Sequence, residues 1–344
     1  MPSSISNKVD LHLHLDGALS YTVVDKLIRE QRISLSQYTE HIPAEFSASE
    51  DNCSSDITCN KFSTETLKSL LTVGPNCQNL VEYLKCFDLP SAILQTEAAL
   101  TLVTFDLIER LEAQGLVYAE IRFAPQLHTV KGMTQQRAVE AVLAGVELAR
   151  RKNFRIRVGI LLCMMVTGDF AANKETAELS VAYRSKGVVG LDLAGAEGAV
   201  PMSEFKSLFG IAYQANLPFT IHAGECGSYD NIAKAISFGA RRIGHGCAAI
   251  LSEDCMELLR REKIVLEMCP TSNLQTRAVP SIQEHPIRRF FDEGILVTVN
   301  TDNMTVSDTC LEKEYQLLRE KLNFTDDEII RMNETAIHAG FIGI

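Results

Sequence analysis

The arrangement of eight short apolar segments constrains the fold more than any other feature of this sequence. Each segment is rich in β-branched residues and ends in polar or glycine-rich residues, and from the second onward their starts are 23 to 37 residues apart. Apolar residues at helical spacing fill the gaps, for example over residues 135–151. Strand and helix alternating at this interval are typical of βαβ units, and eight such units predict a (β/α)8 barrel. The segments are residues 8–15, 117–125, 154–164, 188–195, 218–225, 241–247, 264–272 and 296–303.

The gap between the first and second segments departs from this interval, because it is about 100 residues long. Residues 40–66 are polar, with serine, asparagine, cysteine and threonine clusters, and we expect a loop there. Residues 67–114 have the apolar spacing of helices. We therefore predict an α/β fold with a single domain over residues 1–344. It is a TIM barrel with lid-like helices inserted at about residues 20–114, after the first strand.

The charge of the chain limits its partners. With 33 lysine and arginine residues against 44 aspartate and glutamate residues, the formal net charge is −11. A field of this sign opposes binding to nucleic acid and to anionic membrane surfaces. The sequence begins without a signal-peptide pattern, lacks a membrane-spanning stretch of roughly 18 apolar residues, and has ten cysteines without a C-x-x-C pair. We therefore expect a cytoplasmic protein with reduced thiols, no nucleic-acid partner and no membrane association.

Histidines at the ends of the predicted strands carry most of the chemical information. His12 and His14 are two residues apart on the first segment, so both side chains lie on one face of the strand. His222 lies near the end of the fifth segment and Asp302 near the end of the eighth. The carboxyl ends of barrel strands form one common mouth, so these four residues should meet there. Three neutral imidazoles and a carboxylate suit Zn²⁺ with an open position for water, whose pKa the ion lowers.

Two further residues are candidates for catalysis at the same mouth. Glu225 follows His222 by three residues, just after Gly224. A carboxyl partly desolvated there has a raised pKa and can act as a proton donor. His245 ends the sixth segment between two glycines, which allow a close approach of backbone or ligand. Facing a metal-activated water, His245 could orient that water and carry its proton.

Seven motifs follow one another along the chain: VDLHLHLDGAL, YAEIRFAP, GLDLAGAE, TIHAGE, RIGHG, CPTSN and VNTDN. In this order they resemble the adenosine deaminase family of metal-dependent amidohydrolases, from about residue 8 to residue 335. The resemblance implies zinc-dependent hydrolytic deamination of adenosine and 2′-deoxyadenosine to inosine and 2′-deoxyinosine plus ammonia, a reaction of purine salvage. It also implies one zinc ion per chain and a small-molecule purine nucleoside as the partner.

The resemblance also implies roles for the catalytic residues. Zinc is the family's metal, and it matches the four ligands that the spacing predicts. In the family, the glutamate at the position of Glu225 protonates N1 of the purine, so that the ring can accept electrons. The histidine at the position of His245 orients the water that attacks C6.

The residues that bind the substrate follow from the resemblance as well. It implies that Asp16 takes a ribose hydroxyl, that the backbone N–H of Gly195 meets purine N3, and that His14 lies against the ribose side. The family's usual aspartate, which bonds purine N7, is replaced by Asn303, and an acid that often follows the glycine of D-L-A-G is replaced by Ala196. Both departures concern recognition of the purine edge.

Several alternatives stay open at this point: deamination of free adenine, of an adenosine monophosphate or of an aminofutalosine nucleoside, and a catalytically silent binding homologue. The residues directly after Asp16 contain no lysine or arginine, which disfavours a phosphate, although Lys61 in the polar segment could supply a charge. Free adenine remains possible because Asp16 could face water. The silent homologue is disfavoured because the predicted metal ligands and Glu225 are all present.

Overall fold

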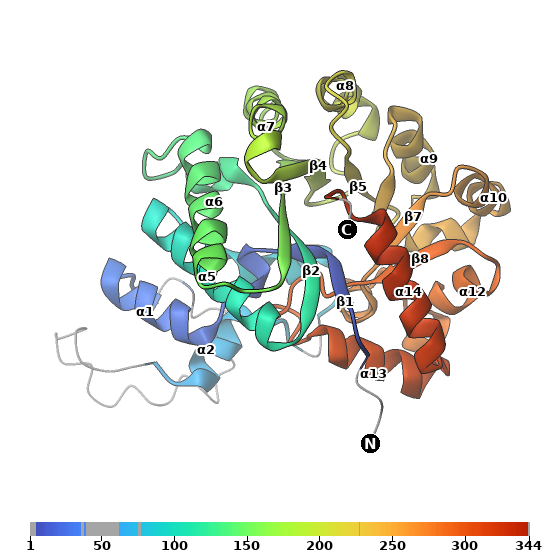
Figure 1. Cartoon of the computed structure of the whole chain (residues 1–344), viewed down its shortest axis with the longest axis horizontal. Helices are drawn as coiled ribbons and strands as arrows, with labels where there is room; N and C mark the ends of the chain where they lie inside the picture. Colours follow the sequence, from blue (N-terminus) through green and yellow to red (C-terminus); the bar gives the residue numbers. More distant parts are fainter. Residues whose placement is uncertain (1–4, 36–37, 39–61, 75–76, 227, 343–344) are drawn as a thin grey trace.

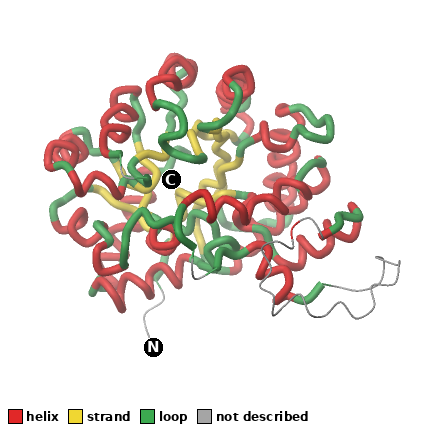
Figure 2. The backbone as a smooth tube through the Cα atoms, turned by 180° about the vertical axis from the view of Figure 1, so that it is seen from behind, coloured by secondary structure: helices red, strands yellow, loops and turns green. Residues whose placement is uncertain are grey.

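Parallel strands lie at the centre of the molecule and helices surround them (Figure 1 and Figure 2). The computed structural model describes residues 5–35, 38, 62–74, 77–226 and 228–342, and eight strands lie within this part of the chain. Each predicted segment overlaps one of them. They are β1 (Lys8–His14), β2 (Leu116–Phe123), β3 (Arg157–Met165), β4 (Val188–Ala194), β5 (Thr220–Ala223), β6 (Arg242–His245), β7 (Val265–Met268) and β8 (Leu296–Val299). Of these, β2 and β3 each extend one residue beyond the predicted bounds.

Pairing of these described strands follows the order of the chain. They form two parallel sheets, β1-β2-β3-β4 and β5-β6-β7-β8. Isolated parallel bridges join the sheets at both junctions: Leu191 on β4 pairs with Phe219 before β5, and Leu13 on β1 pairs with Asp302 after β8. All strands therefore end on the same side, where residues from every strand can meet. The prediction of a (β/α)8 barrel is confirmed.

Helices after β2 cover the outside of the strands. The predicted helix over residues 135–151 is α6 (Gln135–Arg151), whose first turn is capped by the Thr134 side chain and whose inner face buries Ala138 and Val142. The other helices that follow it are α7 (Phe170–Ala182), α8 (Lys206–Gln214), α9 (Tyr229–Phe238), α10 (Glu253–Arg261), α11 (Pro270–Gln275), α12 (Ile287–Asp292), α13 (Leu311–Leu322) and α14 (Asp326–Ala339). Short 3-10 helices are η1 (Asp16–Ala18), η3 (Lys85–Phe87), η4 (Pro125–His128), η5 (Arg184–Lys186), η6 (Met202–Phe205), η7 (Cys247–Leu251) and η8 (Ile282–Glu284).

The long connection between β1 and β2 is helical where it is described. It contains α1 (Tyr21–Gln31), α2 (Thr64–Leu71), α3 (Leu80–Leu84), α4 (Asp88–Ile93) and α5 (Glu97–Ala113). Most of the loop predicted over residues 40–66 lies outside the described residues, as does Lys61. At its end the loop prediction is wrong, because the Ser63 side chain accepts a hydrogen bond from Thr66 N and starts α2 at Thr64. A lid function for these helices and a single domain over the whole chain stay predictions.

Alternation along β1 directs its histidines to the inside of the barrel. Leu13 lies in the main apolar core, and Leu11 packs with Ala336 of α14. His12 and His14 alternate with these leucines along the strand, so their side chains point to the opposite side, into the barrel. Among the described residues, no helix is long and apolar enough to cross a membrane.

Candidate active site

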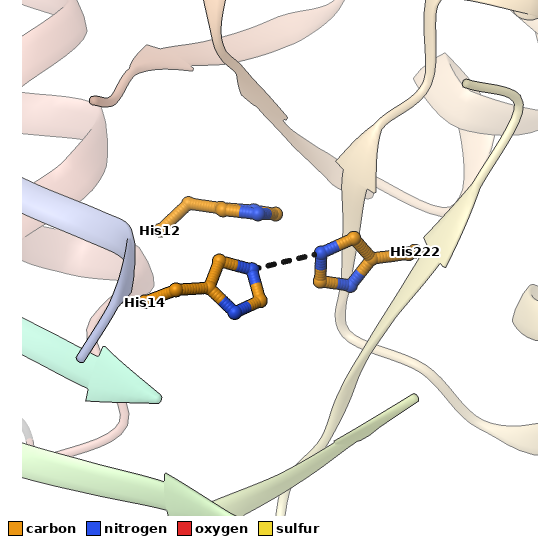
Figure 3. Close-up of side chains that lie close together, drawn as sticks. All are labelled: His12, His14 and His222. Carbon is orange, nitrogen blue, oxygen red and sulfur yellow. Dashed lines mark hydrogen bonds between the residues drawn. The ribbon is translucent and has the colours of Figure 1, made fainter. Parts of the chain in front are cut away.

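Histidine side chains from β1 and β5 converge on one point at the carboxyl ends of the strands (Figure 3). Asp302, from the segment after β8, lies beside them. His14 Nε2 lies 3.2 Å from His222 Nε2. Asp302 Oδ1 lies 3.4 Å from both His12 Nε2 and His14 Nε2. Ligand atoms 2.0–2.1 Å from a shared ion in tetrahedral geometry lie roughly 3.3 Å apart. The spacing of these four residues therefore fits a metal cation.

Asp302 reaches this point because its backbone pairs with β1. It lies three residues beyond the end of β8 at Val299. Its N–H donates to His12 O and its carbonyl accepts from His14 N, both at 2.8 Å. Its φ is 57°, a left-handed conformation that is uncommon outside glycine, and these two bonds hold it there. The Ser272 hydroxyl donates to Asp302 Oδ2 at 2.6 Å, which leaves Oδ1 toward the histidines.

Two buried carboxylates fix the histidine rings. His12 Nδ1 lies 2.8 Å from Glu267 Oε2, and His222 Nδ1 lies 3.1 Å from Asp192 Oδ2. Since a carboxylate only accepts, each Nδ1 carries a proton, and in the neutral ring the Nε2 atom then presents a lone pair toward the shared point. His12 Nε2 is buried and has no hydrogen-bond partner among the described residues. A buried ring nitrogen without a partner, 3.4 Å from a carboxylate oxygen, is an arrangement that a bound metal ion satisfies.

Arg122 connects these two carboxylates through the centre of the barrel. Its guanidinium donates to Asp192 Oδ2 and to Glu267 Oε2, both at 2.8 Å, and all three side chains are fully buried. Sequence reasoning missed this network. The signal was present, because charged residues inside apolar strand segments need buried partners.

Glu225 lies beside the shared point with its carboxyl almost enclosed. Its side chain is 6% exposed, and Oε2 lies 3.6 Å from His245 Nε2. Burial, and next the negative charge of Asp302, raises the pKa of Glu225 from an ordinary 4.5 to about 8. The carboxyl is therefore protonated at neutral pH and can donate a proton.

His245 is neutral, with a defined tautomer. Burial lowers its pKa well below the ordinary value. The Asn273 amide is oriented by Cys269 N–H, which donates to Asn273 Oδ1, so Asn273 Nδ2 donates to His245 Nδ1 at 2.9 Å. The proton of His245 consequently lies on Nε2, on the side of Glu225. Sequence reasoning also missed Asn273, although it belongs to the CPTSN motif.

A pocket opens over these side chains. The structure brings the sequence-predicted site residues together there, apart from His12, which is fully buried and is not among the lining residues. An apolar wall is added by α3, η3, η4 and β3. The lining residues are His14, Asp16, Leu80, Tyr83, Leu84, Phe87, Ala124, Leu127, Cys163, Met165, Ala194, Gly195, His222, Glu225, His245, Asp302 and Asn303.

Asn303 approaches the backbone of η1 closely. A Cβ on Gly17 would lie 1.9 Å from Asn303 Oδ1, so only glycine fits there. Asn303 Oδ1 is buried without a hydrogen-bond partner among the described residues. The turn after it is held by its backbone, because Ser307 N donates to Asn303 O at 2.8 Å. Asn303 is among the residues that line the pocket, so its side chain can contact a ligand there.

Three histidines, an aspartate and a glutamate meet at the strand ends of this barrel. This combination of fold and site is typical of metal-dependent amidohydrolases. Within that class the chain belongs to the adenosine deaminase family, whose sequence model matches residues 53–343. It is a hydrolase that acts on C–N bonds.

Similar proteins differ in the adenine compound that their names specify. The chain is 42% identical over 338 residues to an adenosine deaminase of Haemophilus ducreyi, covering 97% of this chain and 91% of the relative. A solved adenine deaminase from Arthrobacter aurescens is 25% identical with a TM-score of 0.82, covering 98% and 94% of the two chains. An N6-methyl-AMP deaminase from Arabidopsis thaliana is also 25% identical, with a TM-score of 0.79 and coverage of 98% and 92%. Similarity to these proteins therefore does not fix which adenine compound is the substrate, and the residues that line the pocket of this chain have to be considered.

Proposed function

We propose that the chain deaminates adenosine and 2′-deoxyadenosine to inosine and 2′-deoxyinosine with release of ammonia, using one zinc ion per chain. The observation that carries this proposal is the convergence of His12, His14, His222 and Asp302 beside the protonated Glu225. When bound by these four residues, zinc supplies Lewis-acid activation of a water molecule at neutral pH. Neutral imidazoles and a carboxylate are the ligand types that suit this ion.

Glu225 is the proposed proton donor to purine N1. Because its carboxyl is buried and protonated at neutral pH, it can release a proton to the ring as electrons move toward N1. His245 is proposed to orient the attacking water by donating its Nε2–H. In this tautomer Nε2 has no free lone pair, so an orienting role is favoured over the acceptance of a proton.

The described pocket wall favours a nucleoside over a nucleotide. The lining residues in this part of the chain include no lysine or arginine that could pair with a phosphate. Burial raises the pKa of Asp16 to about 6, so its carboxylate is ionised at neutral pH and can accept a hydrogen bond from a ribose hydroxyl. Free adenine would leave this buried carboxylate without that partner. Gly195 and His14 line the same pocket and are proposed to contact purine N3 and the ribose side.

A substrate panel tests this proposal. We expect ammonia release from adenosine and 2′-deoxyadenosine with kcat/KM roughly 100-fold or more above that for adenine, adenosine monophosphate and an aminofutalosine nucleoside. Asp16→Ala should lower kcat/KM for adenosine and leave that for adenine unchanged, since only the nucleoside has a ribose. A preference of the wild-type protein for adenine or the monophosphate would overturn the proposed substrate.

The role of Asn303 gives a separate prediction. Its amide donates a hydrogen bond without titration, so we propose that it reads purine N7, which only accepts. 7-Deazaadenosine has carbon in place of N7 and should be deaminated with kcat/KM roughly 10- to 100-fold lower than adenosine. The comparison is made with both compounds in the same ammonia assay.

Asn303→Ala is the matched variant for this prediction. It should remove most of the preference for adenosine over 7-deazaadenosine, because the amide donor is gone. Equal kcat/KM for the two compounds with wild-type protein would mean that Asn303 does not contact N7 and serves only the turn that follows it.

A further inference from the structure

The Glu197 carboxylate makes a concentrated set of contacts with the segment that carries Glu225. Glu197 Oε1 accepts from Gly224 N at 2.8 Å and from Asn231 Nδ2 at 2.9 Å. Glu197 Oε2 accepts from Glu225 N and from Cys226 N, both at 2.9 Å. Three successive backbone N–H groups thus converge on one carboxylate, together with the side-chain amide of Asn231 on α9.

Such a cluster fixes the backbone on both sides of Glu225. Successive N–H groups that point to one side form a concave anion site, and bonds to an ionised acceptor are stronger than neutral ones. Glu197 lies three residues after the end of β4 at Ala194, whereas Glu225 lies two residues after the end of β5 at Ala223. The four bonds therefore join the ends of two neighbouring strands at the mouth of the barrel.

We propose that Glu197 is a positioning residue that sets the direction in which the Glu225 carboxyl enters the pocket. The inference rests on the proposed role of Glu225 as proton donor. Glu225 has 6% of its side chain exposed and lies 3.6 Å from His245 Nε2, so its placement depends on where its own backbone is held. The backbone N–H of Glu225 is held by Glu197, which itself is not among the residues that line the pocket.

The test begins with Glu197→Gln. A carboxamide offers one acceptor oxygen, and its NH₂ faces backbone N–H groups that also donate, so the cluster cannot be kept. We expect kcat for adenosine to fall roughly 10- to 100-fold, because a misplacement of the order of 1 Å has this effect, while KM changes little. Glu204→Gln, at an exposed glutamate seven residues further along the same connection, should leave both constants unchanged.

A double-mutant cycle separates positioning from a general structural role. If Glu197 acts through Glu225, then Glu197→Gln should lower kcat much less in the Glu225→Gln background than in the wild type. Glu197→Asp keeps the charge with a shorter side chain and should recover part of kcat. If Glu197→Gln does not fold, Glu197→Asp takes its place in the double-mutant cycle.

Two results would overturn the inference alone: wild-type kcat in Glu197→Gln, or the same fold loss in both backgrounds. Absence of adenosine deamination by the zinc-loaded wild-type protein would instead overturn the proposed function, and this inference with it. The two failures are therefore distinguishable in one set of measurements.

Discussion

Glu225→Gln should lower kcat for adenosine by roughly 10²- to 10⁴-fold and leave the zinc content unchanged. The glutamine has nearly the same shape, but it cannot release a proton to purine N1. The carboxyl that it replaces has its pKa raised to about 8 by burial and by Asp302, so the wild-type protein holds the proton at neutral pH. The measurement is kcat from ammonia release, together with zinc per chain from elemental analysis.

The matched control for Glu225→Gln is again Glu204→Gln, which makes the same chemical change at an exposed position. This control should keep the wild-type kcat. Retention of wild-type kcat by Glu225→Gln would show that the proton comes from elsewhere. Loss of zinc from Glu225→Gln would show that this residue serves the metal.

His12→Ala and Asp302→Ala should each lose the metal and, with it, nearly all activity. Loss of a residue that only orients a ligand typically costs 10- to 100-fold in metal affinity, so loss of the ligand itself should cost more than roughly 100-fold. Both side chains lie within 3.4 Å of each other at the shared point, and each removal also leaves the remaining groups buried without a partner. The measurement is zinc per chain after dialysis against a weak chelator.

His338→Ala is a suitable control for these ligand variants, because His338 is exposed on α14 and is not among the residues that line the site pocket. It should retain zinc and activity at the wild-type level. Zinc content equal to the wild type in both His12→Ala and Asp302→Ala would contradict the proposed ligand set.

The barrel and the convergence of the main site residues were accessible from the sequence because both depend on local periodicity. Apolar segments at βαβ spacing predict the strands, and the spacing of His12 and His14 by two residues predicts one shared face. Strand ends of a barrel meet at one mouth, so His222 and Asp302 could be assigned to the same place without knowledge of contacts. Their distances in the structure agree with that assignment.

The residues that support the site were not assigned from the sequence, because residue type alone does not say which buried group each of them bonds. Arg122 bonds Asp192 and Glu267, which are 70 and 145 residues away along the chain. Glu197 bonds backbone N–H groups 27 to 29 residues away, and backbone donors leave no trace in residue type. Ser63 was overlooked because a single serine in a polar segment looks like loop, although it caps α2.

Zinc titration of the chelator-treated protein tests the central claim most directly, with adenosine conversion followed by the loss of its ultraviolet absorbance. The account predicts almost no conversion before zinc is added, and a rise in rate that reaches a plateau at one zinc ion per chain. The same titration with Glu225→Gln should bind one zinc ion per chain without restoring the rate. Equal conversion of adenosine with and without zinc, or no conversion at any zinc concentration, would contradict the account.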